Sequence, residues 1–178
     1  MGVTKTNEVV VTNLVAGQFY DIIIDGPAVF QASQPIQVAQ FANGTEFDHL
    51  IFDFPSDAFI ATEGDPCEIL LPPTGHYLLT NTVFTPFYNT SSTGDFDENY
   101  LNLIVAQSAT NSTYLDYSLV ATTNFVPIGT SGYYGAQLMV TNGTHTVTSS
   151  QPVGVEVYGF GPFDAYSYFG GVVKRQFR

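Results

Sequence analysis

Short apolar runs separated by turn-forming residues recur along the whole chain. Val, Ile, Thr, Tyr and Phe dominate these runs, and such β-branched and aromatic side chains favour the pleated surface of a strand. No stretch spaces its apolar residues three and four apart between helix caps, as an amphipathic helix would. The pattern predicts an all-β protein with strands at residues 8–11, 18–24, 29–32, 37–41, 50–54, 68–71, 76–84, 100–106, 114–120, 137–140, 144–149 and 153–159.

The breaks between the predicted strands are rich in Gly, Pro, Asn and Asp. About a dozen short strands at this spacing are typical of a Greek-key or jelly-roll-like β-sandwich. The length of 178 residues fits one domain with a sizeable core. We therefore expect a single β-sandwich domain over residues 1–178, with short extensions at both ends and a tail at 172–178. Two acidic segments, 52–67 and 87–99, are expected to be irregular.

The charges of the chain are almost all negative. No Lys or Arg occurs between Lys5 and Lys174, whereas all 16 acidic residues lie in that stretch, and the net charge is -12. Such a surface has almost no cations to hold phosphate, so nucleic acid and anionic membrane surfaces are excluded as expected partners. Only 11% of the residues are charged, so uncharged polar side chains must keep the protein soluble. We expect an extracellular or cell-surface location, where such surfaces are common.

Four Asn-x-Ser/Thr sequons are candidate glycosylation sites of an extracellular protein. Two of them contain Asn-Gly, the pair that type I′ hairpin turns prefer, and residues 140–147 are predicted to form a strand, a turn and a second strand. Asn89 and Asn111 are the expected modified sites, because the other two asparagines are expected in tight turns. The four candidates are Asn43, Asn89, Asn111 and Asn142.

One acidic cluster has the character of a calcium site. Oxygen donors alternate there in a predicted loop, and Ca²⁺ takes about six to eight oxygen ligands. The cluster lacks the full EF-hand pattern, so an exposed acidic loop is the alternative. The candidate ligands are Asp95, Asp97, Glu98 and Asn99.

Signals for catalysis are weak. The histidines, His49, His76 and His145, show no two-histidine metal spacing, and no Gly-x-Ser-x-Gly nucleophile motif occurs. We expect strand or turn roles for the histidines and no enzymatic activity. The single cysteine, Cys67, cannot form an internal disulfide. It is expected to be a buried apolar residue, with a bond to another chain or a reactive thiol as alternatives.

Several motifs in a fixed order resemble a known family. They are Gly26-Pro27-Ala28, Gln34-Pro35-Ile36-Gln37-Val38-Ala39-Gln40-Phe41, Gly64-Asp65-Pro66, Leu71-Pro72-Pro73 with Tyr77, Gly143-Thr144-His145-Thr146-Val147, Val155-Glu156-Val157-Tyr158-Gly159-Phe160-Gly161 and Ser167-Tyr168-Phe169-Gly170-Gly171. Together they resemble the C-terminal part of the extracellular domain family of the mucus IgG-Fc-binding protein, which also occurs in bacterial and archaeal surface proteins. The resemblance covers roughly residues 17–171. It implies a β-rich, non-catalytic module for adhesion or matrix assembly that lacks the N-terminal part of the fuller domain, and it supplies no ligand motif.

Two functions follow as hypotheses. The first is a non-catalytic extracellular adhesion or matrix-type module that binds extracellular proteins or glycoconjugates and needs no cofactor. The alternative is a structural subunit of an extracellular filament or sheath, in which each chain binds copies of itself by strand exchange. The β-rich segment 7–15 and the tail 172–178 motivate this alternative, because either could leave the domain and complete the sheet of a neighbour.

Overall fold

The computed structural model describes residues 14–24, 26–44, 64–86, 96, 98–161 and 164–173. Of these residues, 51% lie in strands and 7% in single 3-10 turns, and none lies in an α-helix. The fold is therefore all-β, as the hydrophobic pattern predicts. The strands in this part of the chain are β1 (Val38–Phe41), β2 (Glu68–Leu71), β3 (Leu78–Thr85), β4 (Glu98–Ala106), β5 (Thr113–Leu115), β6 (Ser118–Leu119), β7 (Val126–Pro127), β8 (Tyr133–Val140), β9 (Gly143–Gly161) and β10 (Asp164–Phe169). The 3-10 turns are Thr74–His76, Gln107–Ala109 and Thr122–Asn124.

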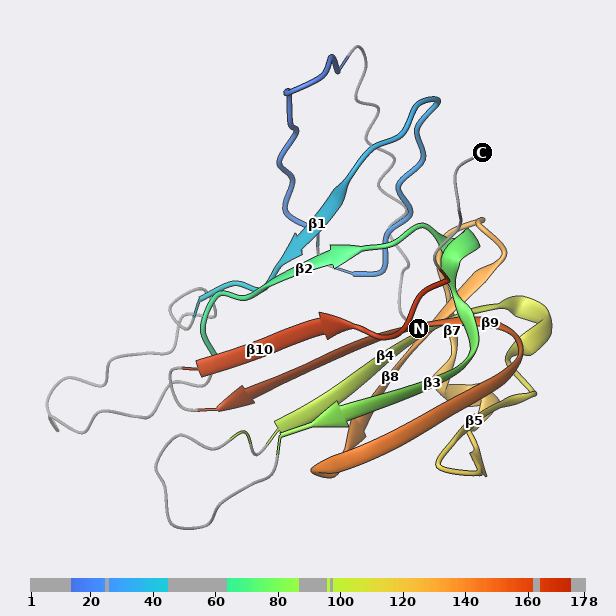
Figure 1. Ribbon diagram of the computed structural model, residues 1–178. Helices are drawn as coiled ribbons and strands as arrows, with labels where there is room; N and C mark the ends of the chain where they lie inside the picture. Colours follow the sequence, from blue (N-terminus) through green and yellow to red (C-terminus); the bar gives the residue numbers. More distant parts are fainter. Residues whose placement is uncertain are drawn as a thin grey trace, which may run out of the picture.

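One long strand, β9, belongs to two antiparallel sheets. Its first part pairs with β3 and β5, and β6 extends this first sheet beside β5. Its last part pairs with β4 and β10, and β8 and β7 extend this second sheet beside β4. Figure 1 shows β9 running along one sheet and turning back into the other. The whole is a curled antiparallel sheet with a sandwich-like fold.

The bend of β9 lies where two separate strands, 144–149 and 153–159, are predicted. Ser149 is the last residue that pairs with β5, and Val153 pairs with Leu78 of β3. Pro152 lies between them, at the bend, where neither ladder needs a backbone N–H donor. Proline, which has no N–H, is therefore tolerated at this position. The two predicted strands are therefore one continuous strand of 19 residues.

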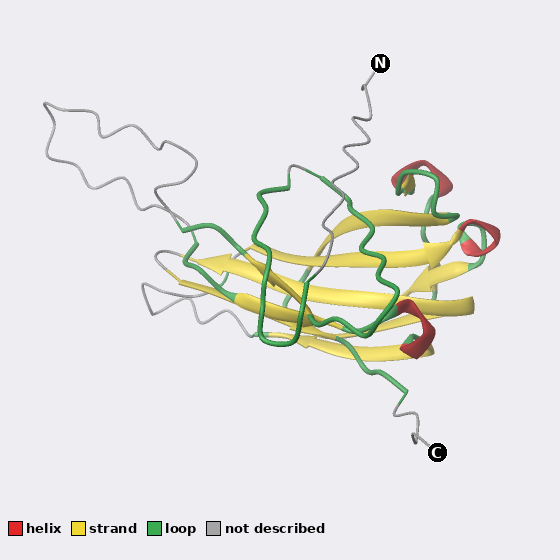
Figure 2. Ribbon diagram, turned by 90° about the horizontal axis from the view of Figure 1, so that it is seen from above, coloured by secondary structure: helices red, strands yellow, loops and turns green. Residues whose placement is uncertain are grey.

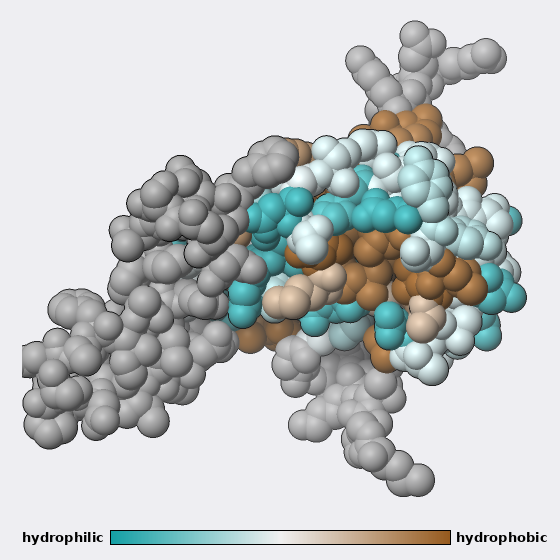
Figure 3. All heavy atoms as spheres, turned by 90° about the horizontal axis from the view of Figure 1, so that it is seen from below, coloured by the Kyte–Doolittle hydropathy of each residue, from teal (hydrophilic) through white to brown (hydrophobic). Residues whose placement is uncertain are grey.

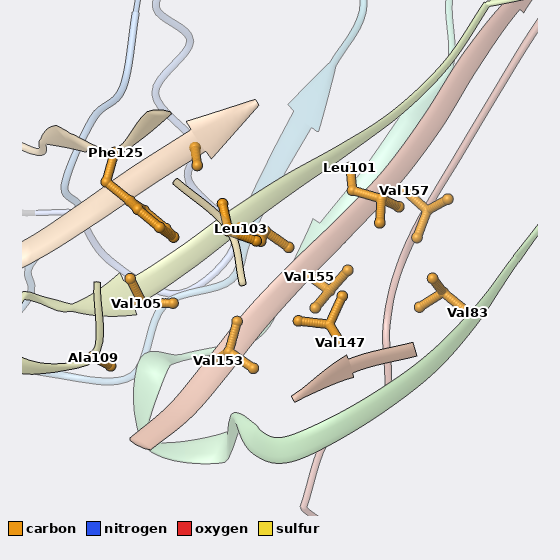
Figure 4. Packing of buried hydrophobic residues seen from close by; sticks show 12 residues of the cluster. Val83, Leu101, Leu103, Val105, Ala109, Phe125, Val147, Val153, Val155 and Val157 are labelled. Atoms are coloured by element: carbon orange, nitrogen blue, oxygen red, sulfur yellow. The ribbon is translucent and has the colours of Figure 1, made fainter. Parts of the chain in front are cut away.

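The core lies between the two sheets. In β4 every second residue from Asn99 to Val105 is fully buried, while the residues between them face outward and are half-buried, which is the period of two that a strand imposes. Figure 4 shows side chains of β3, β4 and β9 converging in this core. Burying one Val or Leu side chain is worth about 1.5–3 kcal/mol, so this cluster is the main source of stability. Its buried members are Val83, Leu101, Leu103, Val105, Ala109, Val120, Phe125, Ala136, Val147, Val153, Val155 and Val157.

The predicted hairpin at 140–147 is wrong, although both of its strands exist. β8 ends at Val140 and pairs only with β4 and β7 within the described part of the chain, whereas β9 starts at Gly143 in the other sheet. Thr141 and Asn142 therefore cross between the sheets. Gly143 has a φ of 122°, a backbone conformation that residues other than Gly rarely adopt.

The structure differs from the predicted strands in two ways. Near the N-terminal end of the described chain, residues 18–24 and 29–32 form no strand. Further along, β7 and β10 occur where no strand was predicted. A strand needs a neighbouring strand to accept and donate its backbone hydrogen bonds. Residues 18–24 have suitable side chains but no such neighbour among the described residues. The predicted strands 8–11 and 50–54 lie outside the described residues.

We call residues 14–24 and 26–44 the apolar arm. Near its end lies β1, which pairs with β2 as a two-stranded ribbon. β2 lies beside β10, where the Ser167 hydroxyl donates to the carbonyl oxygen of Glu68 at 3.2 Å. The apolar arm rises from the sandwich on this side in Figure 1 and stands in front of the strands when seen from above in Figure 2.

Candidate binding surfaces

The outward side of the second sheet carries an array of aromatic, amide and carboxylate side chains. In register, Tyr100 of β4 lies opposite Tyr158 of β9, and Asn102 lies opposite Glu156 on one side and Gln137 on the other. These residues share one face because they occupy alternate positions of neighbouring strands. We call the set the tyrosine face: Tyr100, Asn102, Gln137, Glu156, Tyr158 and Phe160.

The polar groups of the tyrosine face hold one another in place. The Asn102 Nδ2 donates to Glu156 Oε2 at 3.1 Å, and the Tyr158 hydroxyl donates to Asn102 Oδ1 at 3.3 Å. Gln137 Nε2 donates to the same tyrosine hydroxyl. The network thus ties together β8, β4 and β9, and such a fixed polar surface is preorganised for binding.

The aromatic rings of this face are stacked beside the network. The ring centroids of Tyr100 and Tyr158 are 5.4 Å apart with 19° between the planes, and those of Tyr158 and Phe160 are 5.7 Å apart. Aromatic residues dominate the energetics of protein contacts, and a flat ring with a polar tip also suits a sugar. The face can therefore offer stacking and hydrogen bonding to one ligand.

The electrostatics of the tyrosine face centre on one carboxyl. Burial raises the pKa of Glu156 above its usual range, although the hydrogen bond from Asn102 acts in the opposite direction. Tyr77 lies next to it, and burial together with the charge of Glu156 raises the pKa of the Tyr77 phenol. A β-carbon on Gly154 would lie 2.6 Å from the Tyr77 ring. Only a glycine at this position therefore lets the ring pack against the sheet.

The apolar arm exposes many large hydrophobic side chains. Phe19 is 87% exposed, Ile23 79% and Val15 63%. Contiguous exposed apolar surface is uncommon on soluble monomers and marks interaction sites. Figure 3 looks at the face opposite to the one that the arm covers, and there a separate band of hydrophobic residues lies between hydrophilic ones. Other exposed apolar residues of the arm are Leu14, Tyr20, Ile22, Ile24, Val29, Phe30, Ile36 and Phe41.

His145 occupies a polar site of its own. Its side chain is only 7% exposed, and its Nδ1 lies 2.6 Å from Asp116 Oδ2. Its Nε2 lies 2.7 Å from the carbonyl oxygen of Thr141. A carbonyl can only accept, so Nε2 donates and fixes the ring. His145 lies in β9 and His76 in a 3-10 turn, as predicted, whereas His49 lies outside the described residues.

The structure describes two of the four predicted calcium ligands. The Asn99 side chain is buried, its Nδ2 donates to the carbonyl oxygen of Phe96 at 3.3 Å, and its Oδ1 accepts from the Tyr166 hydroxyl. The Glu98 carboxylate accepts from the Tyr100 hydroxyl at 2.8 Å. Asn99 thus has a structural role. Asp95 and Asp97 lie outside the described residues, so calcium binding stays a prediction. Within the described part, no three His, Cys, Asp or Glu side chains are grouped so that they could hold a metal.

The described sequons differ in exposure. Asn43 and Asn111 are exposed, whereas Asn142 is half-buried and its Oδ1 accepts from Asn99 Nδ2 at 3.1 Å. Asn89 lies outside the described residues, and glycosylation stays a prediction at all four sites. Cys67 is free and half-buried rather than fully buried as predicted.

The tyrosine face and the His145 site were not found from the sequence. The one local sign of the tyrosine face in the sequence is the segment that ends in Gly161, where Glu156 and Tyr158 alternate with valines. Their partner Asn102 is 54 residues away from Glu156, and only the strand register brings the two together.

No described helix is long and apolar enough to cross a membrane. No significant match was found among curated proteins or among solved structures. The sequence profile of the family described as IgGFc binding protein matches residues 3–159. The match starts before the first motif of the resemblance, Gly26-Pro27-Ala28, and ends before the last, Ser167-Tyr168-Phe169-Gly170-Gly171. The matched range contains the whole apolar arm, and it contains the tyrosine face except Phe160. The chain therefore belongs to the IgGFc binding protein family, a family of extracellular binding modules.

Proposed function

We propose that this protein is a non-catalytic module of adhesion or matrix type that binds another extracellular protein. The observation that carries the proposal is the exposure of the apolar arm, whose Phe19 and Ile23 are 87% and 79% exposed while the core of the sandwich is closed. Covering such side chains removes apolar surface from water, at about 25 cal/mol per Å². A protein partner can supply that cover.

The charge of the chain limits the partner. All Lys and Arg residues lie outside the described residues, and the net charge is -12. A partner that presents a neutral or basic surface is therefore favoured over nucleic acid or an anionic membrane. The name of the family points to the Fc region of IgG as the first partner to test. Glycoconjugates are a second class of candidate partner, because the stacked rings and fixed amides of the tyrosine face suit a sugar.

The test measures binding to immobilised IgG Fc. Phe19→Ser and Ile23→Ser are expected to weaken binding at least about tenfold each, because hot-spot side chains typically contribute about 2 kcal/mol or more. Melting temperatures should stay unchanged, since neither side chain belongs to the core. Val126→Ser, on a 49% exposed residue of β7, is the matched control and should bind as the wild type does. No binding of the wild type, or equal losses in all three variants, would reject the proposal.

A separate variant tests the tyrosine face. Met139 lies opposite Tyr100 and is 63% exposed, so Met139→Arg would cover the face without breaking its network. Loss of binding to Fc or to a glycan array in this variant alone would identify the face as the contact surface. Unchanged binding would restrict the contact to the apolar arm.

A filament or sheath subunit is the second candidate. It is favoured by residues 18–24, which have strand-forming side chains but no strand partner among the described residues. Such a segment could add to the sheet of a neighbouring chain. Size-exclusion chromatography and negative-stain imaging separate the candidates, because the binding module should give monomers and the filament subunit a periodic polymer.

A further inference from the structure

The turn between β5 and β6 has an unusual backbone. Its two central residues, Asp116 and Tyr117, have φ angles of 48° and 66°. They are the only residues other than Gly with positive φ in the described part of the chain. A two-residue hairpin with both φ angles positive is a type I′ turn, which prefers Asn-Gly or Asp-Gly. Tyr117 therefore occupies a position where a Gly or Asn would be less strained.

Asp116 is held firmly against β9. Its N–H donates to the carbonyl oxygen of Thr146 at 2.9 Å, and its Oδ1 accepts from the Thr146 N–H at 2.8 Å. Its Oδ2 lies 2.6 Å from Nδ1 of the buried His145, whose other nitrogen donates to Thr141. These contacts explain the conformation of Asp116, and they fix the position of the turn.

The Tyr117 side chain has no structural role among the described residues. It is 92% exposed, and no hydrogen bond or ring contact of it occurs among the described residues. A bulky side chain in a strained and solvent-exposed position points to function rather than to stability. Because Asp116 and His145 anchor the turn, the exposed ring is presented with little freedom, which lowers the entropy lost on binding.

We propose that Tyr117 is a contact residue for the protein partner, inserting its phenol ring into a pocket with a neutral or basic rim. The proposal rests on the proposed function as a protein-binding module. Tyrosine is enriched among the residues that dominate protein interfaces, because it combines a large apolar ring with a polar tip. The rim must not be acidic, because the chain as a whole carries a charge of -12 and would repel it.

Tyr117→Asn and Tyr117→Gly provide the test, with immobilised IgG Fc as the probe. Both variants remove the ring and suit the left-handed backbone, so the melting temperature is expected to rise by about 2–4 °C. Affinity for Fc is expected to fall at least about tenfold. Val126→Ser is the control for loss of an exposed apolar side chain elsewhere. His145→Gln should weaken binding less than either substitution of Tyr117, because it loosens the turn but keeps the ring.

The outcomes are separable from those of the proposed function. Fc binding by the wild type that both Tyr117 variants retain would overturn the inference and leave the proposed function intact. A fall in melting temperature for both variants would also overturn it, because the ring would then support the fold. A wild type that does not bind Fc rejects the proposed function, and a missing rise in melting temperature would then still reject the inference.

Discussion

The hydroxyl group of Tyr168 closes the outer edge of β3 at Phe84. It accepts a hydrogen bond from the Phe84 N–H at 2.7 Å and donates one to the Phe84 carbonyl oxygen at 2.6 Å. Phe84 pairs with Thr144 of β9 on its other side. Exposed edge strands invite pairing with other chains. One hydroxyl from β10 thus satisfies both backbone groups that another chain would need for pairing at this position.

Tyr168→Phe should therefore destabilise the protein and open this edge. The ring still packs against the core, but two hydrogen bonds disappear, so we expect the free energy of unfolding to fall by about 1–3 kcal/mol. Denaturant unfolding measures this loss, and chromatography at rising concentration measures self-association. Tyr114→Phe is the control, since its hydroxyl makes no hydrogen bond within the described residues. Equal effects of the two substitutions would contradict the role of Tyr168.

Asp116 predicts a loss of stability in acid. Burial acts to raise the pKa of its carboxyl, but the hydrogen bonds from His145 and Thr146 and the charge of His145 outweigh burial and lower the pKa below its usual value. A lowered pKa in the folded state gives stability that is present above the unfolded pKa of about 3.9 and is lost as the pH falls through the folded pKa. Asp116→Asn should cost about 1 kcal/mol at neutral pH, because the group is exposed and screened. The variant should also lose less stability than the wild type between about pH 4 and 2 in thermal melts.

Glu156 predicts the opposite pH dependence. Its raised pKa means that the folded state holds the proton more tightly than the unfolded state does, so its contribution to stability increases as the pH falls toward the unfolded pKa of about 4.3. Glu156→Gln removes the buried charge and keeps an oxygen that can accept from Asn102. We expect equal or higher stability at pH 7 and a smaller change with pH. A variant that is much less stable than the wild type at pH 7 would show that the charge itself stabilises the network.

Gly159 is required by close approach of the backbone. A β-carbon there would lie 2.7 Å from the Glu98 carbonyl oxygen and would also meet the Tyr166 ring. The carbonyl belongs to the β4 ladder and cannot move freely, so Gly159→Ala should cost about 1–3 kcal/mol or more. Gly26→Ala is the control, because a β-carbon at that position meets no atom within 4 Å. Similar denaturant midpoints for the two variants would refute this explanation.

Calcium binding predicts a stabilised fold. Saturating Ca²⁺ at about a hundredfold excess over Kd should add about 2.7 kcal/mol, which is several degrees in melting temperature. Asp97→Asn should remove most of this shift, whereas a nonspecific ionic effect would survive the substitution and appear equally with Mg²⁺. If chelation does not change the melting temperature of the wild type, the calcium hypothesis fails.

The alternation of hydrophobic and polar residues was sufficient to predict the bounds of the strands that follow it. β2 has the predicted bounds, and β4 begins only two residues before its predicted start. Asn99 was assigned to an acidic loop, yet it is in phase with Leu101 and Leu103, and this phase places it in the core. Alternation alone could have shown its burial.

Pairing partners could not be predicted in the same way. The Asn142-Gly143 pair suits a hairpin, but local turn chemistry does not determine which sheet the next strand joins. Residues 18–24 have the side chains of a strand, but no neighbouring strand pairs with them in the described part of the chain. The strain at Tyr117 is equally invisible in sequence, because it depends on how Asp116 meets β9.

The bend of β9 has a consequence for how the molecule folds and bears load. Because β9 is a member of both sheets, both sheets depend on the same strand, and residues as distant as Asn81 and Val153, 72 positions apart, must meet as the protein folds. Such long-range closure slows folding and favours a single cooperative transition. The same strand acts as a covalent strap between the two layers. A pulling force that separates the two layers must therefore break the hydrogen bonds that hold β9 in at least one of the sheets.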